Sequence, residues 1–372
     1  MRIVYLCADR GIPLLGAKGA SVHLRSLAAA LARRGNETIL ACRRLDGDNP
    51  LPSAVRVERL PPSEEEQPGW IETLLRDAMA DVLLERYSLD SGPGLEAAKR
   101  AGARYVLEVN APLVEEAARY RGLSDTAACL ERERSLIARS DRIIAVSSGI
   151  RAHALASGAT AGRVCVIPNG VDLALFRRAR RESVRARLGL GGKVVVGFAG
   201  SLKPWHGVSE LVAAFAGLTG RAQLLLVGDG PEREAVALAA GRPGLEGHVT
   251  MTGAVPHTCV PDYLSAMDIG VAPYRPQERF YFSPLKVAEY MAAGLPVVAS
   301  DQGDLPALLA DAGVLVPPGD TARLAGALRQ LVGDEQARRR LGRAARARSR
   351  TLSWDRVAWR VERAFGCGPQ AA

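Results

Sequence analysis

The segment SPLKVAEYMAAG, residues 283–294, places a lysine and a glutamate three residues apart on a predicted helix. We expect Ser283 to cap this helix and Pro284 to occupy its first position, where no N–H is needed. The N–H groups of Leu285 and Lys286 then have no partner within the helix. Together with the Lys286 ammonium group they predict a pocket for an anion such as phosphate.

Glu289 lies on the same helix face as Lys286. One interpretation is an ion pair on the helix surface, which contributes about 0.3–0.5 kcal/mol. In the other interpretation, the carboxylate accepts hydrogen bonds from two vicinal ribose hydroxyls, because both of its oxygens are acceptors. A phosphate pocket and a diol acceptor one turn apart indicate a receptor for a nucleoside diphosphate.

A second candidate loop is FAGSLKPWHG, residues 198–207, which follows a predicted buried strand. Gly200 turns the chain there, and Lys203 and His206 precede the next helix. A cation at this place neutralises the charge of a diphosphate, which is the function that we expect of Lys203. His206 either contributes to the same site or serves as a helix cap or a surface residue.

The first loop, DRGIPLLGAKGAS at residues 9–21, contains two glycines that allow the backbone to approach a ligand, Gly16 and Gly19. A helix is predicted from Ser21, its cap, to Gly35, and its first N–H groups suit an anion. Lys18 faces phosphate, acceptor or solvent. The loop is not GxGxxG and the second strand does not end in an acid, which argues against a dinucleotide-binding dehydrogenase.

Length and composition predict a protein of two domains. The chain has 372 residues, a formal charge of +9 and 48% hydrophobic residues, and no apolar run is long enough to cross a bilayer. The start, MRIVYLCADRG, lacks the pattern of a signal peptide. The six cysteines have no CxxC or metal-ligand spacing, so we expect reduced, mostly buried thiols and a cytoplasmic protein.

Short apolar strands alternate with amphipathic helices in two series, which predicts parallel sheets covered by helices. The strands are expected at 2–8, 37–42, 54–58, 81–85, 104–109, 142–146 and 163–167, and then at 194–200, 223–230, 249–255, 269–273, 296–300 and 313–318. Residues 167–192 form the connection, and we interpret their arginine run as a solvated helix face. Two doubly wound domains would bind ligand at the carboxyl ends of both sheets, in a cleft between them.

Taken together, these segments resemble the retaining glycosyltransferases of family 4, which have the GT-B fold. The resemblance covers residues 1 to about 366 and includes VIPNGVD (166–172), LLLVGDGPE (224–232) and GVLVPPGD (313–320). It implies two Rossmann-like domains facing a central cleft. Residues 1–180 would bind the acceptor and residues 181–352 the nucleotide-sugar donor. In residues 353–372, a C-terminal helix would return to the first domain and a tail would follow.

The resemblance also implies roles for individual residues. Glu289 would hold the ribose, Lys203 and Lys286 would stabilise the diphosphate during catalysis, and the backbone at Ala254 and Val255 would contact the base. Gly16 and Gly19 would close over the pyrophosphate. No metal or other cofactor would be obligatory.

Several positions depart from the family pattern. Tyr281 stands where the family has the first of two acids eight residues apart, so the donor sugar stays open, and the backbone amides of Phe282 and Ser283 could serve instead. Ser201 and His206 replace a common arginine and lysine, for which Lys203 could compensate. Asn110, which we regard as a candidate catalytic residue, replaces a histidine that often follows the middle strand of the first domain and, with Glu108, would border the cleft.

The predicted function is transfer of a sugar from a nucleoside-diphosphate sugar to an acceptor hydroxyl with retained configuration. The acceptor is a small molecule, such as an aminocyclitol or a natural-product aglycone, or a glycolipid or polysaccharide precursor. The alternatives are a nucleotide-sugar-binding protein without activity and a sugar-nucleotide epimerase. We expect no nucleic acid partner, and the basic surface admits weak peripheral contact with the inner membrane face. The sequence leaves the base, the linkage and the oligomeric state open.

Overall fold

The computed structural model describes residues 1–48, 50, 54–120 and 122–366. The chain divides into two compact units. Unit 1 comprises Met1–Gly170, Tyr281–Ser283 and the C-terminal part from Trp354, and unit 2 comprises Val171–Phe280 and Pro284–Ser353. The short segment Tyr281–Ser283 therefore belongs to unit 1, although both of its neighbours along the chain belong to unit 2.

Unit 1 is a seven-stranded parallel sheet in the order β3-β2-β1-β4-β5-β6-β7. Its strands are β1 (Arg2–Cys7), β2 (Glu37–Cys42), β3 (Arg56–Arg59), β4 (Val82–Arg86), β5 (Arg104–Val109), β6 (Arg142–Ala145) and β7 (Val164–Val166). Its α-helices are α1 (Gly19–Arg33), α2 (Gln67–Asp77), α3 (Pro93–Ala101), α4 (Leu113–Tyr120), α5 (Thr126–Arg139), α6 (Ser148–Ala156) and α15 (Trp354–Phe365). The strand order reverses between β1 and β4, as in doubly wound folds.

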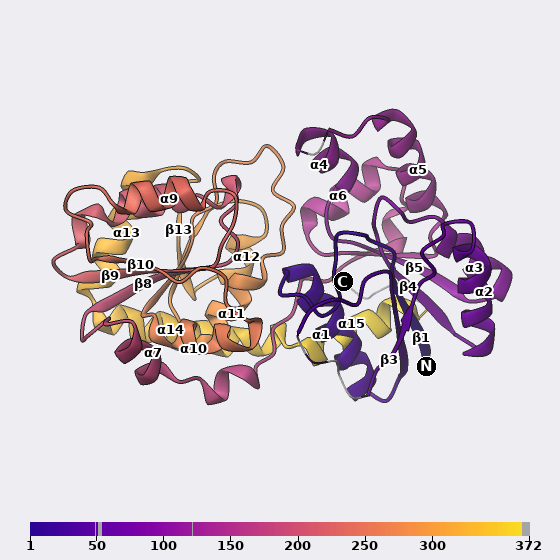
Figure 1. The fold of residues 1–372 in the computed structure, drawn as a ribbon, viewed down its shortest axis with the longest axis horizontal. Helices are drawn as coiled ribbons and strands as arrows, with labels where there is room; N and C mark the ends of the chain where they lie inside the picture. The colour runs from indigo at the N-terminus through magenta and orange to yellow at the C-terminus, as the bar shows by residue number, and fades with distance from the viewer. Residues whose placement is uncertain (49, 51–53, 121, 367–372) are drawn as a thin grey trace. The chain divides into compact units, whose positions relative to one another are not determined.

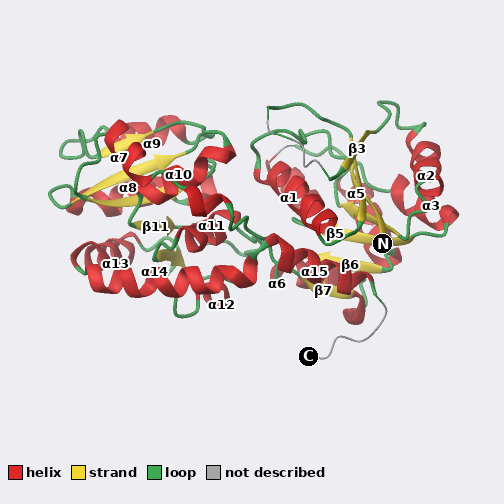
Figure 2. Cartoon of the chain, turned by 90° about the horizontal axis from the view of Figure 1, so that it is seen from below, coloured by secondary structure: helices red, strands yellow, loops and turns green. Residues whose placement is uncertain are grey.

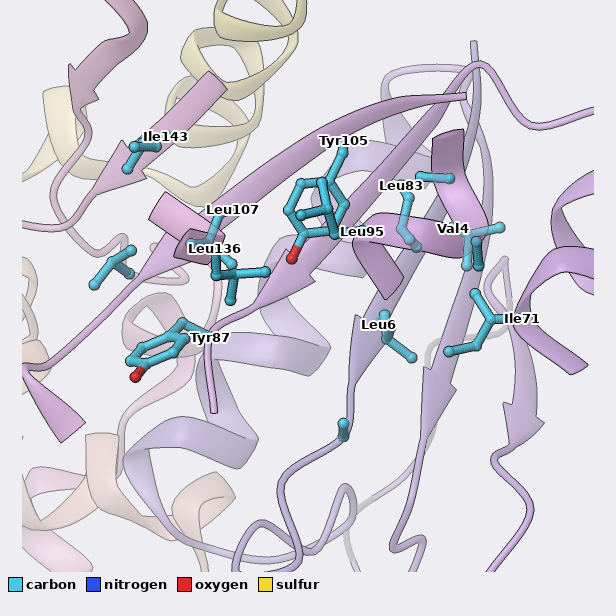
Figure 3. Packing of buried hydrophobic residues seen from close by; sticks show 14 of the residues in the cluster. Val4, Leu6, Ile71, Leu83, Tyr87, Leu95, Tyr105, Leu107, Leu136 and Ile143 are labelled. Carbon is cyan, nitrogen blue, oxygen red and sulfur yellow. The ribbon is translucent and has the colours of Figure 1, made fainter. Parts of the chain in front are cut away.

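Alternating side chains of these strands cover the two faces of the sheet. On one face, Leu6, Leu83 and Leu107 pack with Ile71 of α2 and Leu136 of α5 (Figure 3). On the other face lies α1, against which α15 packs through an edge-on contact of His23 and Trp354, with ring centroids 5.2 Å apart. Figure 2 shows α1 and α15 in the unit that contains the N-terminus.

Unit 2 is a six-stranded parallel sheet in the order β10-β9-β8-β11-β12-β13, which reverses between β8 and β11. Figure 1 labels β8, β9, β10 and β13 of this sheet among the helices of the unit. Its strands are β8 (Val194–Ala199), β9 (Ala222–Val227), β10 (Val249–Met251), β11 (Ile269–Ala272), β12 (Val297–Ser300) and β13 (Gly313–Val316). Its α-helices are α7 (Arg181–Arg187), α8 (Val208–Phe215), α9 (Arg233–Ala240), α10 (Val260–Ala266), α11 (Leu285–Ala293), α12 (Leu305–Leu309), α13 (Thr321–Gly333) and α14 (Glu335–Ser349).

The predicted α/β class is confirmed, since each strand of both predicted series corresponds to a strand of one parallel sheet. The local predictions were wrong at Ser21 and, in part, in the connection. The first helix begins at Gly19, and Ser21 lies inside it and donates its hydroxyl hydrogen to the Pro13 carbonyl instead of capping. In the connection, Arg181 and Arg185 each donate to Asp268 at 2.7 Å and anchor α7, whereas other arginines of the run, Arg177, Arg180 and Arg187, are exposed as expected.

Candidate functional site

The strand order of unit 2 points to the loops at the carboxyl ends of β8 and β11, because ligands bind there in doubly wound sheets. The loop after β8 begins at Gly200, and the chain after β11 leads to α11. Helix α11 begins at Leu285, with Pro284 as its N-cap residue and without a side-chain cap. Ser283 was expected to be that cap, but its hydroxyl oxygen instead accepts the Asn169 N–H at 2.9 Å within unit 1.

Lys286 is buried in the first turn of α11, with 9% of its surface exposed. Its ammonium nitrogen lies 4.2 Å from the ring centroid of Phe198 and 5.3 Å from that of Tyr274. Among the described residues, nothing accepts a hydrogen bond from Nζ. Burial lowers the pKa of Lys286 to about 7, against the opposing effect of Glu289. A cationic group held among aromatic rings without an acceptor is suited to receive an anion.

Gly200 makes room for this lysine. A Cβ atom added to Gly200 would lie 3.0 Å from the Lys286 Cε and 3.1 Å from Nζ, and the backbone φ of +139° also favours glycine. The Gly200 carbonyl itself lies close to Gly228 of the loop after β9. Gly200 and Lys286, which were predicted as separate site residues, therefore lie next to each other.

The rest of the loop after β8 forms a 3-10 turn, Pro204–His206. The Lys203 ammonium group lies 5.7 Å from the Trp205 ring, and the His206 ring packs edge-on against Tyr274 at 5.3 Å. Through Nδ1, His206 bonds to the Ser201 carbonyl. Burial, and then the charges of Lys286 and Lys203, lower the pKa of His206 to about 2, so this ring is neutral near pH 7.

Glu289 has a partner that the sequence did not reveal. His257 donates from Nε2 to the Glu289 Oε1 at 2.9 Å. Ala254 and Val255 belong to the same loop after β10 as His257, and the Gly228 N–H holds this loop by donating to the Gly253 carbonyl at 2.9 Å. The predicted base-contacting loop and the predicted ribose-binding acid are thus connected through one hydrogen bond.

The remaining predicted residues lie in unit 1. Gly16 and Gly19 flank the start of α1, where Arg25 donates to the Gly16 carbonyl at 2.9 Å and Lys18 donates to the Gly11 carbonyl at 2.8 Å. Lys18 therefore bonds the backbone of its own loop. Gly19 is the first residue of α1.

The segment before α11 is held by unit 1. The Tyr281 hydroxyl donates to the Glu116 carboxylate, and the Tyr281 carbonyl accepts the Ser147 hydroxyl hydrogen at 2.7 Å. The Phe282 ring lies 4.3 Å from the Tyr281 ring. The phenol that stands where the family has an acid is therefore next to a carboxylate from α4.

Asn110 directly follows β5, and its Nδ2 is buried without a hydrogen-bond acceptor among the described residues. Two residues earlier, Glu108 is buried and accepts from His23 at 2.7 Å and from the Tyr5 hydroxyl at 2.6 Å. Burial acts to raise the pKa of Glu108, but His23 and Arg86 outweigh it and lower the pKa to about 2. His23 was missed in the sequence, where it occurs as a single histidine within an apolar helix face.

Groups of three or more His, Cys, Asp or Glu side chains that could hold a metal ion do not occur in the described part of the chain. Nor is any described helix both long and apolar enough to span a bilayer.

Two family models match the chain. The one described as Glycosyltransferase Family 4 covers residues 17–175, and the one described as Glycosyl transferases group 1 covers residues 193–334. A D-inositol 3-phosphate glycosyltransferase of Xylanimonas cellulosilytica is 30% identical over 380 residues, 92% of this chain and 90% of the relative. One of Segniliparus rotundus is 34% identical over 238 residues, or 61% of this chain, and the match spans about half of that relative, 52%.

The solved structure of Anabaena Alr3699/HepE in complex with UDP is similar in fold, with a TM-score of 0.79 and 21% identity over 98% of this chain and 99% of the other. The two parallel, doubly wound units thus define a protein of the GT-B fold, as predicted. Within that class, the chain belongs to the group 1 glycosyltransferases of family 4.

Proposed function

We propose that this protein transfers a sugar from a nucleoside-diphosphate sugar to an acceptor hydroxyl with retained configuration at the anomeric carbon. The observation that carries the proposal is Lys286, a buried ammonium group without a hydrogen-bond acceptor among the described residues, at the start of α11. The N–H groups of a helix start and a lysine together suit the diphosphate of a donor.

In this proposal unit 2 binds the donor. The diphosphate contacts Lys286 and Lys203 beside the turn at Gly200 and Ser201, and the Glu289 carboxylate accepts from the ribose hydroxyls. The loop at Ala254 and Val255 contacts the base. The HepE structures contain UDP and UDP-glucose, which favours a uridine nucleotide here. Unit 1 binds the acceptor.

In the proposed reaction the protein stabilises charge and forms no covalent bond with the sugar. The bond between the anomeric carbon and the diphosphate oxygen breaks, and the acceptor oxygen forms its bond on the same face of the sugar. The acceptor proton passes to the leaving diphosphate, whose growing negative charge Lys203 and Lys286 stabilise. His206 is neutral and donates its one ring hydrogen from Nδ1 to the Ser201 carbonyl, so its Nε2 can only accept a hydrogen bond at this site and adds no charge. No metal is required in this scheme, because the two lysines neutralise the diphosphate.

A panel of nucleotides and acceptors tests the proposal. We expect one nucleoside diphosphate, and its sugar, to raise the melting temperature of the protein more than the others among UDP, GDP, dTDP and ADP. With that donor, an acceptor panel should yield a product whose anomeric configuration matches the donor by NMR. If no nucleotide stabilises the protein, the proposal is wrong. Stabilisation without transfer to any acceptor or to water would instead favour a nucleotide-sugar-binding protein without activity.

A further inference from the structure

Tyr290 of α11 contacts the backbone at the end of β8. The residue is 0% exposed, and its hydroxyl oxygen accepts the Ala199 N–H at 2.7 Å. Ala199 is the last residue of β8 and directly precedes Gly200, where the turn of the candidate site begins. The Ala199 carbonyl and the carbonyl of Val271 in β11 each lie 3.4 Å from the same hydroxyl. The phenol therefore contacts both strands between which the order of the sheet reverses.

The hydroxyl takes the place of a hydrogen bond between these strands. The pairing of β8 with β11 ends at Gly197 and Gly270, two residues before Ala199. A buried backbone N–H is unfavourable when it has no acceptor, and beyond this point β11 no longer supplies one. The Tyr290 oxygen is that acceptor. Burial raises the pKa of Tyr290, so the hydroxyl is protonated and neutral near pH 7.

Gly270 of β11 leaves room for the Tyr290 ring. A Cβ atom added to Gly270 would lie 2.8 Å from two ring atoms, Cγ and Cδ2, and 3.2 Å from the Tyr290 Cβ. Favourable contacts between carbon atoms are about 3.5–4.0 Å long, so a side chain at this position would displace the ring. The position of the phenol is therefore determined by packing against β11 as well as by its bond to β8.

The same helix carries Lys286 one turn before Tyr290. Residues four apart in a helix lie on the same face, and the backbone hydrogen bonds of the helix keep them at a constant separation. The Lys286 side chain lies beside Gly200, where an added Cβ atom would be 3.0 Å from Cε. The turn after β8 therefore has two contacts with α11, one from the Tyr290 hydroxyl to Ala199 and one from Lys286 to Gly200.

We propose that Tyr290 is a positioning residue of the donor site, whose hydroxyl bond to Ala199 fixes the Gly200 turn relative to the Lys286 ammonium group. This inference deepens the proposed function and rests on it, because the diphosphate is proposed to lie beside this turn and to contact Lys286. Hydrogen bonds to a phosphate group weaken when their donors are displaced, so the turn and the ammonium group must keep one separation. Tyr290 itself makes no contact with the diphosphate.

Tyr290→Phe tests the proposal, because it removes the hydroxyl and keeps the ring. We expect UDP-glucose to bind this variant about three- to tenfold more weakly than the wild type, the scale of one lost hydrogen bond, as measured by calorimetry. Tyr105→Phe is the matched control. It removes an equally buried hydroxyl in unit 1, which donates to Glu85 at 2.7 Å, and should leave the affinity for UDP-glucose unchanged.

A double variant separates positioning from a general effect on the fold. In Lys286→Met there is no ammonium group to position, so the addition of Tyr290→Phe should weaken UDP-glucose binding by less than about twofold. The same loss in both backgrounds would overturn the inference, and so would wild-type affinity in Tyr290→Phe. If Tyr290→Phe does not fold, Gly270→Ala decides, because its methyl group displaces the ring and leaves the hydroxyl in place. Gly270→Ala should then weaken UDP-glucose binding, and wild-type affinity would overturn the inference.

The pKa of Lys286 in the free protein separates this inference from the proposed function. It can be measured by NMR with ¹³C-labelled lysine, since the chain has only five lysines, Lys18, Lys99, Lys193, Lys203 and Lys286. Burial holds the pKa of Lys286 at about 7. Without the Tyr290 hydroxyl the pocket admits water, so the pKa should rise toward the ordinary value of lysine.

The two measurements together distinguish the possible failures. If the wild type binds no nucleoside diphosphate, the donor site is wrong, and the pKa of Lys286 in Tyr290→Phe still decides the positioning: a raised pKa supports it and an unchanged pKa overturns it. If the wild type and Tyr290→Phe bind UDP-glucose equally, the transferase proposal stands and only the role of Tyr290 is wrong.

Discussion

His257 and Glu289 form a hydrogen bond of 2.9 Å between the imidazole Nε2 and the carboxylate Oε1, and their side chains are 21% and 14% exposed. The bond joins the loop after β10 to the face of α11. Because each carboxylate oxygen can accept more than one hydrogen bond, His257 fixes the orientation of Glu289 and still leaves acceptor capacity for two hydroxyls.

We predict that Glu289→Ala weakens UDP binding by about 1.5–3 kcal/mol, the scale of hydrogen bonds to a charged group. A UDP analogue that lacks the 2′ and 3′ hydroxyls should bind the wild type and Glu289→Ala equally, because it makes no contact with the carboxylate. Calorimetry with both ligands measures this difference. An equal loss for UDP and the dideoxy analogue would show that Glu289 acts on the fold and not on the ribose.

His257→Ala should weaken UDP binding by a smaller factor than Glu289→Ala does, since the carboxylate remains but loses its fixed orientation. A hydrogen bond of this kind contributes about 0.5–1.5 kcal/mol. We expect His257→Gln to restore part of the loss, because its amide N–H₂ group can donate to Glu289. In the Glu289→Ala background, His257→Ala should have almost no further effect on UDP affinity. Additive losses in the double variant would contradict a positioning role.

Lys203 and Lys286 are predicted to act on the rate. Lys203→Ala should raise the barrier to transfer by about 2–4 kcal/mol, as found when one charge-stabilising donor is removed from a transition state. Lys193→Ala removes the same charge from an exposed position before β8 and serves as the matched control. Turnover with a saturating donor is the measurement. A Lys203→Ala enzyme as fast as Lys193→Ala would show that Lys203 is an ordinary surface residue.

Much of the fold could be predicted from short-range patterns in the sequence. Apolar strands that alternate with amphipathic helices predicted both parallel sheets, because a strand buried on both faces is apolar throughout. Lys286 and Gly200 could be predicted as site residues because a glycine turn and a helix start have recognisable chemistry. The Ser283 cap was wrong because the hydroxyl bonds to Asn169, 114 residues away, which no local pattern reveals.

The partners of the site residues were beyond the sequence for the same reason. His257 and Glu289 are 32 residues apart, and His23 and Glu108 are 85 residues apart. Such pairs depend on which strands become neighbours. The Tyr290 hydroxyl and the Ala199 N–H, 91 residues apart, also meet only in the folded unit.

Glu85, in the core of unit 1, predicts a pH effect on stability. Its Oε2 accepts the Tyr105 hydroxyl hydrogen at 2.7 Å, and Oε1 has no partner among the described residues. Burial raises the pKa of Glu85 to about 7, although hydrogen bonds to Ser91 and Tyr105 act to lower it. Between about pH 4.5 and 7 the folded state therefore holds one proton more than the unfolded state, and stability from this group falls as the pH rises.

We expect Glu85→Gln to remove this dependence, because the amide does not titrate. The measurement is the free energy of unfolding in urea for both proteins at pH 5, 6, 7 and 8. The stability of the wild type relative to that of the variant should decrease as the pH rises. The difference between the two proteins isolates Glu85 from all other titrating groups. A difference that stays constant from pH 5 to 8 would show that Glu85 is ionised in the folded protein throughout.

Lys286 gives the sharpest prediction for the donor site. Burial lowers its pKa to about 7, so at pH 8 the side chain of the free protein is mostly neutral. A diphosphate beside it favours the ammonium form and raises that pKa. Binding of UDP-glucose, whose own diphosphate does not titrate in this range, should therefore take up close to one proton at pH 8 and almost none at pH 6. Calorimetry in buffers of different ionisation enthalpy measures this number.

The matched variant is Lys286→Met, which keeps the apolar stem and removes the charge. It should bind UDP-glucose more weakly, and without proton uptake at either pH. In the absence of ligand it should be more stable than the wild type by about 1–3 kcal/mol at pH 6, because a buried charged group without a partner is unfavourable. That gain should shrink between pH 7 and 10.5, where the wild-type unfolded state binds the extra proton. Proton uptake by Lys286→Met equal to the wild type would assign the titration to another group and leave Lys286 without contact to the diphosphate.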